Sequence, residues 1–158
     1  MRIMDDKTID VTSLALDGLM QKHRTISANI ANADVAGYQR QDVSFEDQLS
    51  EILEKDYEHE AYKSANSKLS PIDPQSVMLS KEMSATTAAK ALEAKQAYGN
   101  FKPMHLEDDA PAVSDNGNNV NVEKEMVELA KNTTKYTVLS ETLSRKMAGL
   151  SEIIKGVQ

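Results

Sequence analysis

The sequence predicts an all-α, elongated fold in which long N- and C-terminal helices pair as an antiparallel coiled coil. Heptad-spaced apolar residues occur at both ends of the 158-residue chain. Aromatic residues are scarce, with two Phe, five Tyr and no Trp, whereas Met is frequent, with eight. This composition suits helix–helix seams better than a compact interior. Since an apolar seam must be covered, the two ends are expected to cover each other.

The N-terminal part, residues 1–37, is predicted to be a polar leader followed by a helix from about Thr8 to Ala33. The expected seam steps by three and four, and it consists of Ile9, Thr12, Leu16, Leu19, His23, Ile26, Ile30 and Ala33. On a coiled-coil seat His23 is expected to set register rather than bind a metal. Gly37 is expected to end the helix in a left-handed conformation, and Tyr38 to pin the chain against the helix end.

The C-terminal part, residues 120–158, carries the longer heptad, and Asn121 is its predicted N-cap. The seats are Val122, Met126, Leu129, Thr133, Tyr136, Ser140, Leu143, Met147, Leu150, Ile154 and Val157, of which nine are apolar or aromatic. Other apolar residues, such as Val127 and Val138, lie off this seam. Because one partner helix cannot cover both sides, a second contact, most simply with a neighbouring subunit, is expected. The two terminal helices are predicted to form one axial-type domain.

The middle segment, residues 38–119, is predicted to be irregular or partly helical, with loops and short helices that can be partly disordered in the isolated chain. A short helix is expected over 44–56 with Ser44 as its N-cap. A polar loop is expected from Tyr57 to Pro74 and a second loop over 100–119. Between them, residues 76–98 have the small residues of a helix whose face permits close packing.

No pattern of catalytic or cofactor-binding residues emerges. The net charge of −7 and the scattered Lys and Arg argue against a nucleic-acid partner. The absence of Cys excludes thiol catalysis and disulfides, and the glycines never form a G-x-G loop. Asp115–Asn119 fails as a calcium loop because Ala112 would be its first ligand. Glu107–Asp109 is interpreted as a solvated loop. We therefore expect a protein that is not an enzyme and has no metal, cofactor or small-molecule substrate. No apolar run long enough to span a membrane and no Sec-type signal are seen.

Two motifs at opposite ends are more specific than the heptads. The first is Ile26-Ser-Ala-Asn-Ile-Ala-Asn-Ala-Asp-Val-Ala-Gly-Tyr38, continuing to Phe45-Glu46. The second is Asn118-Asn-Val-Asn-Val-Glu-Lys-Glu-Met126, followed by Leu129-Ala-Lys-Asn132 and Tyr136. Asn29 and Asn32 lie beside the first seam, where amide side chains can fix register. The pair of motifs resembles the terminal signatures of bacterial flagellar rod and hook proteins. Length and motif order are most similar to the FlgB family of proximal rod proteins, although Val35-Ala36 replaces the usual Thr-Pro.

The resemblance implies a structural subunit of the flagellar basal-body rod, the drive shaft that crosses the periplasm and is needed for motility. It implies export by the flagellar type III apparatus without a cleaved signal peptide. The implied partners are copies of itself, neighbouring rod proteins such as FlgC, the adaptor FliE, the membrane ring and the export apparatus. The residues expected to carry assembly are Leu16, Leu19, His23, Ile26, Asn29, Ile30, Asn32, Met126, Leu129, Tyr136, Leu143, Met147, Leu150 and Ile154, with Gly37 and Tyr38 forming the turn. The alternative is a cytoplasmic coiled-coil adaptor or export chaperone.

Overall fold

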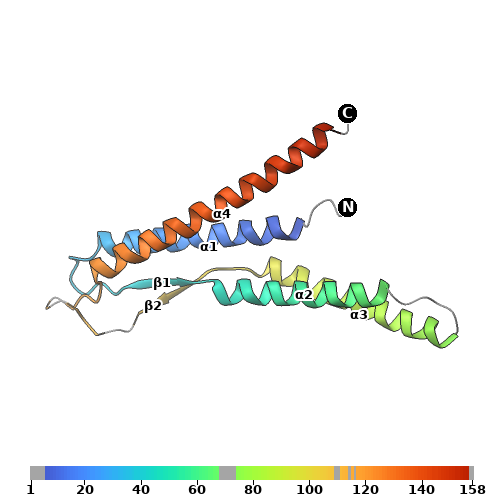
Figure 1. Cartoon of the computed structure of the whole chain (residues 1–158). Coiled ribbons are helices and arrows are strands. Elements are labelled where there is room, and N and C mark those ends of the chain that lie inside the picture. The colour runs from blue at the N-terminus through green and yellow to red at the C-terminus, as the bar shows by residue number, and fades with distance from the viewer. Residues whose placement is uncertain (1–5, 68–73, 109–110, 114, 116, 157–158) are drawn as a thin grey trace. The chain divides into compact units, whose positions relative to one another are not determined.

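The computed structural model describes residues 6–67, 74–108, 111–113, 115 and 117–156. Within these residues it has four helices and two short strands (Figure 1). In chain order they are α1 (Asp6–Ala31), β1 (Gln41–Ser44), α2 (Glu46–Ser67), α3 (Pro74–Gly99), β2 (Met104–Glu107) and α4 (Val122–Gly156). The predicted all-α class is therefore confirmed, apart from one small two-stranded sheet. In the described part of the chain, no helix combines the length and apolar character needed to cross a membrane.

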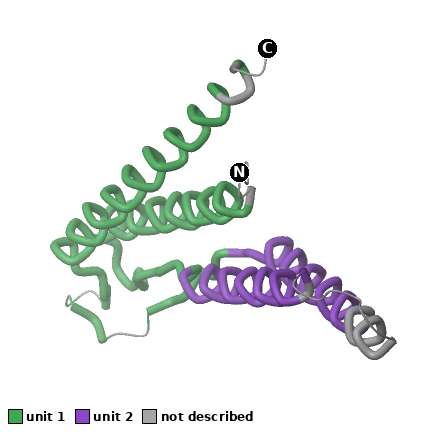
Figure 2. The backbone as a smooth tube through the Cα atoms, turned by 45° about the vertical axis from the view of Figure 1, so that its right-hand side comes forward, with its two compact units in different colours: residues 1–45, 103–158 green, residues 46–102 purple. Residues whose placement is uncertain are grey.

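The chain divides into two compact units, coloured separately in Figure 2. The first unit contains residues 1–45 and 103–158, and the second contains residues 46–102. Both terminal helices and both strands thus lie in the first unit. The second unit consists of the helices α2 and α3.

In the first unit, α1 and α4 pack as the predicted antiparallel pair (Figure 1). Ala15, Leu19 and Ile26 of α1 are buried and supply the apolar part of this core. The two helices lie side by side near the C-terminal end of α1. Towards its own C-terminus α4 diverges from α1, as Figures 1 and 2 both show. The C-terminal half of α4 therefore has no helix of its own unit along it.

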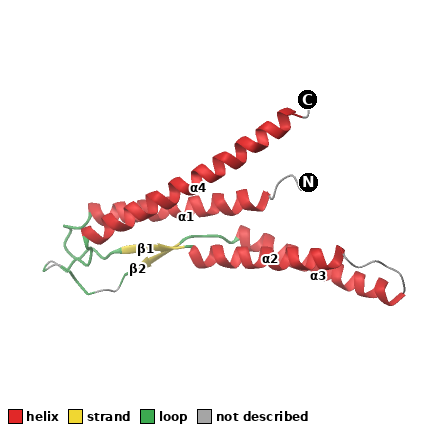
Figure 3. Cartoon of the chain, viewed as in Figure 1, coloured by secondary structure: helices red, strands yellow, loops and turns green. Residues whose placement is uncertain are grey.

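A two-stranded antiparallel sheet, yellow in Figure 3, joins the two halves of the first unit. Its register pairs Gln41 with Glu107 and Ser44 with Met104. Val43 of β1 is almost fully buried, whereas all four residues of β2 are exposed. The sequence predicts irregular structure here, and that prediction is wrong for both strands. β1 has one apolar residue, and β2 alternates as Met-His-Leu-Glu over only four residues, the shortest run that indicates a strand.

Gly18 of α1 is required by packing, because the ring of Phe45 lies directly over it. A Cβ atom at Gly18 would lie 2.5–2.8 Å from three carbons of that ring. Such distances are well inside van der Waals contact. Phe45 itself is 3 % exposed, so the ring has little room to retreat. Phe45, the first residue after β1, therefore packs on α1 at the point where Gly18 leaves room for its ring.

In the second unit, α2 and α3 pack against each other. Tyr98 donates a hydrogen bond to Asp56, and Lys90 pairs with Glu58 at 2.9 Å. The helix expected over 76–98 is confirmed by α3, which begins at Pro74, where proline suits the first helical turn.

The prediction for α2 is wrong at both of its ends. Ser44 ends β1 and the helix begins at Glu46, so Ser44 is not the N-cap. The expected loop after Tyr57 is helical as far as Ser67. Residues 57–67 contain neither Gly nor Pro, and their Glu, Ala and Lys residues favour a helix. Polarity alone was therefore a poor sign of a loop in this segment.

Candidate assembly site

Asn29, from the first motif, lies at the centre of a buried polar cluster in the first unit. Its side chain is fully buried and makes four hydrogen bonds. Oδ1 accepts from the backbone N–H of Gln41 at 3.0 Å and from the hydroxyl of Tyr38 at 3.1 Å. Nδ2 donates to the backbone oxygen of Gln41 at 2.7 Å and to Oε2 of Glu125 at 3.0 Å. One amide thus joins α1, the start of β1 and α4.

Glu125, from the second motif, is the buried anion of this cluster, with a side chain 1 % exposed. Its Oε1 accepts from Nε of Arg40 at 2.7 Å. The residue lies in the first turn of α4, where the helix dipole favours a negative charge. Asn121 caps that turn as predicted, because its Oδ1 accepts from the N–H of Lys124 at 3.0 Å. The buried carboxylate is therefore paired, hydrogen-bonded and well placed on its helix.

Arg40 connects Glu125 to β2. Its Nη1 lies 3.1 Å from Oδ2 of Asp108, and its backbone oxygen accepts from the Asp108 N–H at 2.9 Å. Burial alone would lower the pKa of the Arg40 guanidinium, but the hydrogen bond to Glu125 and the charges of Glu125, Asp42 and Asp108 together raise it. Arginine thus stays charged at any working pH. The interpretation of Asp108 as part of a solvated loop is wrong, while Asp109 lies outside the described residues.

Asn118 and Asn119 hold the loop before α4 against the end of α1. Asn118 Nδ2 donates to the backbone oxygens of Asn32 and Val35, each at 2.9 Å. Asn119 Oδ1 accepts from the Arg40 N–H at 2.6 Å, and its Nδ2 donates to the Asp108 backbone oxygen at 2.6 Å. Both amides are buried. We call Asn29, Tyr38, Arg40, Asp108, Asn118, Asn119 and Glu125 the polar network.

Gly37 and Gly117 provide the two sharp turns that bring these residues together. Their φ angles are 70° and 81°, a region that glycine adopts without steric cost. Gly37 follows α1, as the sequence analysis expected, and leads directly into Tyr38. Gly117 precedes the two asparagines, and its backbone oxygen accepts from Nε2 of Gln39 at 3.3 Å.

The predicted seam residues are buried to different degrees. Leu19, Ile26 and Asn29 are buried; Leu16, His23, Ile30, Asn32, Leu129, Tyr136, Leu143 and Leu150 are partly buried. Met126 and Met147 are exposed, at 60 % and 52 %. The side chain of Ile154 lies outside the described residues. Asn32 differs from Asn29, because among the described residues its Nδ2 donates only to the backbone oxygen of Ala28 in its own helix, at 2.7 Å. Whether these residues act in assembly stays a prediction.

Asn132 belongs to the second motif but is not among the site residues predicted from the sequence. Its side chain is buried between α4 and α1, and its Nδ2 donates to the backbone oxygen of Leu19 at 2.9 Å. Its Oδ1 is buried and has no hydrogen-bond partner among the described residues. A buried amide between two helices favours one register of the helix pair over registers shifted along the helix axis, at a cost in stability.

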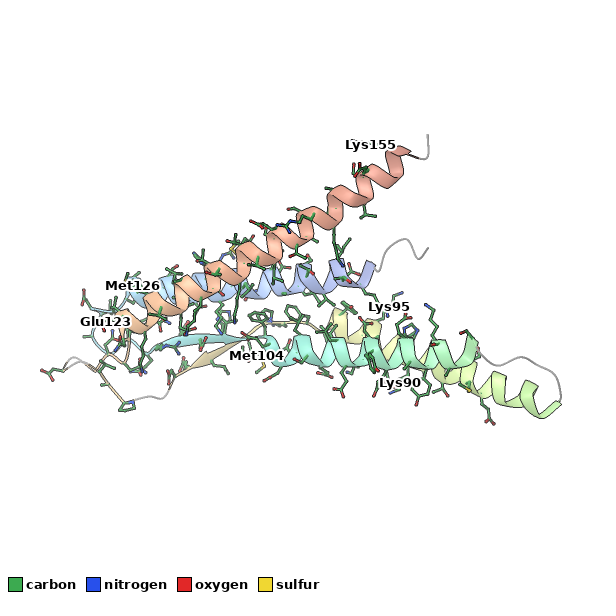
Figure 4. The ribbon with its side chains drawn as sticks, viewed as in Figure 1. Lys90, Lys95, Met104, Glu123, Met126 and Lys155 are labelled. Atoms are coloured by element: carbon green, nitrogen blue, oxygen red, sulfur yellow. The ribbon has the colours of Figure 1, made fainter. Side chains whose placement is uncertain are left out.

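An open cleft of about 640 Å³ lies beside the polar network, bounded by Arg40 and Asp108 and by the first turns of α4. Its lining carries both charges, and α4 supplies Lys124, Lys131, Glu123 and Glu128. Glu128 accepts from Lys131 at 2.7 Å, and this hydrogen bond lowers the pKa of its carboxyl group. Figure 4 marks Glu123 and Met126 at this end of α4. In the described parts of the chain, no group of three or more His, Cys, Asp or Glu side chains could hold a metal ion.

Comparison with known proteins points to one class. A family model described as flagella basal body rod protein matches residues 14–39, the segment that contains Asn29. The FlgB proteins of Bacillus subtilis and Aeromonas hydrophila are 28 % and 27 % identical to this chain. The first alignment covers 94 % of each protein, and the second covers all of both. FlgB of Borreliella burgdorferi is 25 % identical over 95 % of this chain and 97 % of its own length. Each of these relatives is named flagellar basal body rod protein FlgB.

Proposed function

Because this chain belongs to the FlgB family of flagellar basal body rod proteins, we propose that it assembles through its terminal helices into the rod and is needed for motility. Within the rod its role is structural. It is exported through the flagellar type III apparatus and works where the rod crosses the periplasm. Its partners are copies of itself, neighbouring rod proteins such as FlgC, the adaptor FliE and the membrane ring with its export apparatus.

The observation that carries this proposal is the hydrogen bond between Asn29 and Glu125, one from each terminal motif. Through it, the two ends of the chain form one unit, and the buried side chains of Asn29 and Glu125 have their hydrogen-bond partners inside that unit. A rod subunit needs its terminal helices fixed to each other before it can present a constant surface to its neighbours. The polar network supplies this fixed junction at one end of the helical pair.

The C-terminal half of α4, which has no helix of its own unit along it, also supports the proposal. Val138 and Met147 are more than half exposed on α4, which diverges from α1 towards its C-terminus. Exposed apolar residues on an isolated helix favour a partner helix. We infer that neighbouring axial subunits cover this half, and that the isolated subunit frays there. Amide exchange on the dilute protein should show weak protection after residue 138 and strong protection near Glu125. Strong protection throughout α4 in a monomer would count against this part of the proposal.

Genetic replacement tests the function directly. Deleting the gene from the source strain should abolish swimming, and the unaltered chain supplied in trans should restore it. A chain with Asn29→Ala should restore swimming poorly, whereas Asn32→Ala, a matched change in the same motif, should restore it well. Purified basal bodies from the restored strain should contain the chain. If the chain stays in the cytoplasm with an export substrate, the alternative of an adaptor or chaperone is correct instead.

A further inference from the structure

The two strands of the small sheet differ in what lies along their outer edges. In an antiparallel pair, directly opposite residues alternate between hydrogen-bonded pairs and pairs whose backbone groups point away from the partner strand. The N–H of Asp108 donates to the oxygen of Arg40, directly opposite, so this position is a hydrogen-bonded pair. The register then makes the backbone groups of His105 and Glu107 point away from β1, and those of Gln41 point away from β2.

The outer edge of β1 is already occupied by a side chain of the polar network. Asn29 of α1 accepts from the N–H of Gln41 at 3.0 Å and donates to its oxygen at 2.7 Å, as a neighbouring strand would. The next outward N–H, that of Val43, donates to Oδ1 of Asp42 at 2.7 Å, and the side chain of Val43 is buried. Asn29 and α1 therefore close this edge to a further strand.

The outer edge of β2 is open. In the described part of the chain, the outward backbone groups of His105 and Glu107 make no hydrogen bond. Both residues are exposed, and so are Met104, marked in Figure 4, and Leu106, at 53 % and 45 %. Pro103 precedes β2, and proline in sheets is confined to edge strands and strand starts. The edge therefore offers unpaired N–H and C=O groups to a third strand.

The side chains of β2 indicate what such a strand must carry. Because side chains alternate along a strand, Met104 and Leu106 share one face with Asp108, which also lines the open cleft. Val113 and Val127 line that cleft as well and are 60 % and 54 % exposed. A segment laid along β2 would thus meet apolar side chains at alternate positions and reach the cleft at Asp108.

The two edges also limit where the strand can come from. In a second copy of this chain the outer edge of β1 is closed by Asn29, so it cannot pair with β2. Pairing of two β2 edges would use the same surface in both copies and close on a pair, so it could not repeat along a rod. Among its described residues, this chain therefore has no strand that could lie beside β2 at every position of a rod.

We propose that the outer edge of β2 binds an extended segment of a different protein of the basal body, which adds a third strand to the sheet. The backbone groups of His105 and Glu107 supply the hydrogen bonds. The segment carries apolar side chains at alternate positions, beside Met104 and Leu106, and a Lys or Arg beside Glu107. This inference rests on the proposed rod function, but the site is separate from the terminal helices.

His105→Pro tests the open edge, because it removes an outward N–H and leaves the hydrogen bonds between β1 and β2 in place. Proline is accepted on an edge strand when its missing N–H faces away from the sheet. The matched control is His105→Thr, which keeps the N–H and favours a strand. Both purified variants should unfold at the same temperature as the unsubstituted chain. In purified basal bodies, the amount of the His105→Pro chain should fall by about tenfold or more, whereas the His105→Thr chain should be incorporated normally.

Hydrogen exchange on the unsubstituted chain provides a test that needs no substitution. In the isolated chain, the amides of His105 and Glu107 should exchange rapidly, because they have no acceptor. In purified basal bodies they should exchange at least about tenfold more slowly, as measured by mass spectrometry on a fragment covering residues 103–108. If proline destabilises the isolated chain, this measurement alone decides.

Three results would overturn the inference. One is equal incorporation of stable His105→Pro and His105→Thr chains. Another is unchanged exchange at His105 and Glu107 in basal bodies that contain the chain. The third is a disulfide-linked homodimer of a His105→Cys chain in oxidised basal bodies, which would indicate that a second copy supplies the strand, since the natural chain has no Cys. Absence of the unsubstituted chain from basal bodies would instead reject the rod function itself.

Discussion

Asn29 and Glu125 are separated by 96 positions in the chain, yet Nδ2 of the first lies 3.0 Å from Oε2 of the second. Both side chains are buried, and each has further partners in the polar network. A buried carboxylate is stable only if it is paired and hydrogen-bonded. This single contact therefore makes the folding of each terminal motif depend on the other.

Asn29→Ala should lower the free energy of unfolding by about 3 kcal/mol, because it removes four hydrogen bonds and leaves buried groups unsatisfied. Asn32→Ala should change it by less than about 0.5 kcal/mol, because that side chain bonds only to its own helix and alanine favours a helix. Urea denaturation of the two variants measures the difference. Equal effects would mean that the amide at Asn29 has no special role.

Arg40→Met should destabilise the first unit by about 3–5 kcal/mol, since it leaves Glu125 as an uncompensated buried charge. Combining it with Glu125→Leu should recover part of this loss. The matched control is Arg145→Met, which breaks an exposed pair with Glu141 and should cost under about 0.5 kcal/mol. A double-mutant cycle from denaturation curves gives the coupling. A coupling near zero would contradict the assigned pairing.

Gly18→Ala should destabilise the protein by about 1–3 kcal/mol, because the new Cβ would overlap the ring of Phe45. Gly149→Ala is the control within α4, where a Cβ would meet no atom within 4 Å. It should stabilise the helix by about 0.5–1 kcal/mol. Thermal unfolding followed by circular dichroism distinguishes the destabilising change at Gly18 from the stabilising change at Gly149. A stabilising Gly18→Ala would show that Phe45 does not pack on α1 as described.

Asn132→Leu should leave stability unchanged or raise it by about 1 kcal/mol, since it removes a buried acceptor that has no partner among the described residues. Swimming should nevertheless decline if this amide selects the alignment of α1 and α4. Denaturation and a soft-agar assay on the same variant separate these two effects. A stable variant that swims normally would mean that the amide does not set register.

The sequence by itself determined the helical class, the antiparallel pairing of the chain ends, the cap at Asn121 and the turn at Gly37. These features depend on local patterns: heptad spacing, capping chemistry and the conformational freedom of glycine. The family resemblance also followed from the two motifs, because their residues are contiguous in the chain.

Only the tertiary structure revealed the strands β1 and β2, the full length of α2 and the partners of Arg40, Asp108 and Glu125. β1 has a single apolar residue and β2 alternates over only four residues, so neither strand gives a strong periodic signal. Charged residues such as Asp108 look fully solvated in sequence until a distant segment pairs with them. Gly18 is the clearest case, because a glycine inside a helix looks like a weakness in sequence. Glycine is required at this position because the ring of Phe45 occupies the space that any larger side chain would need.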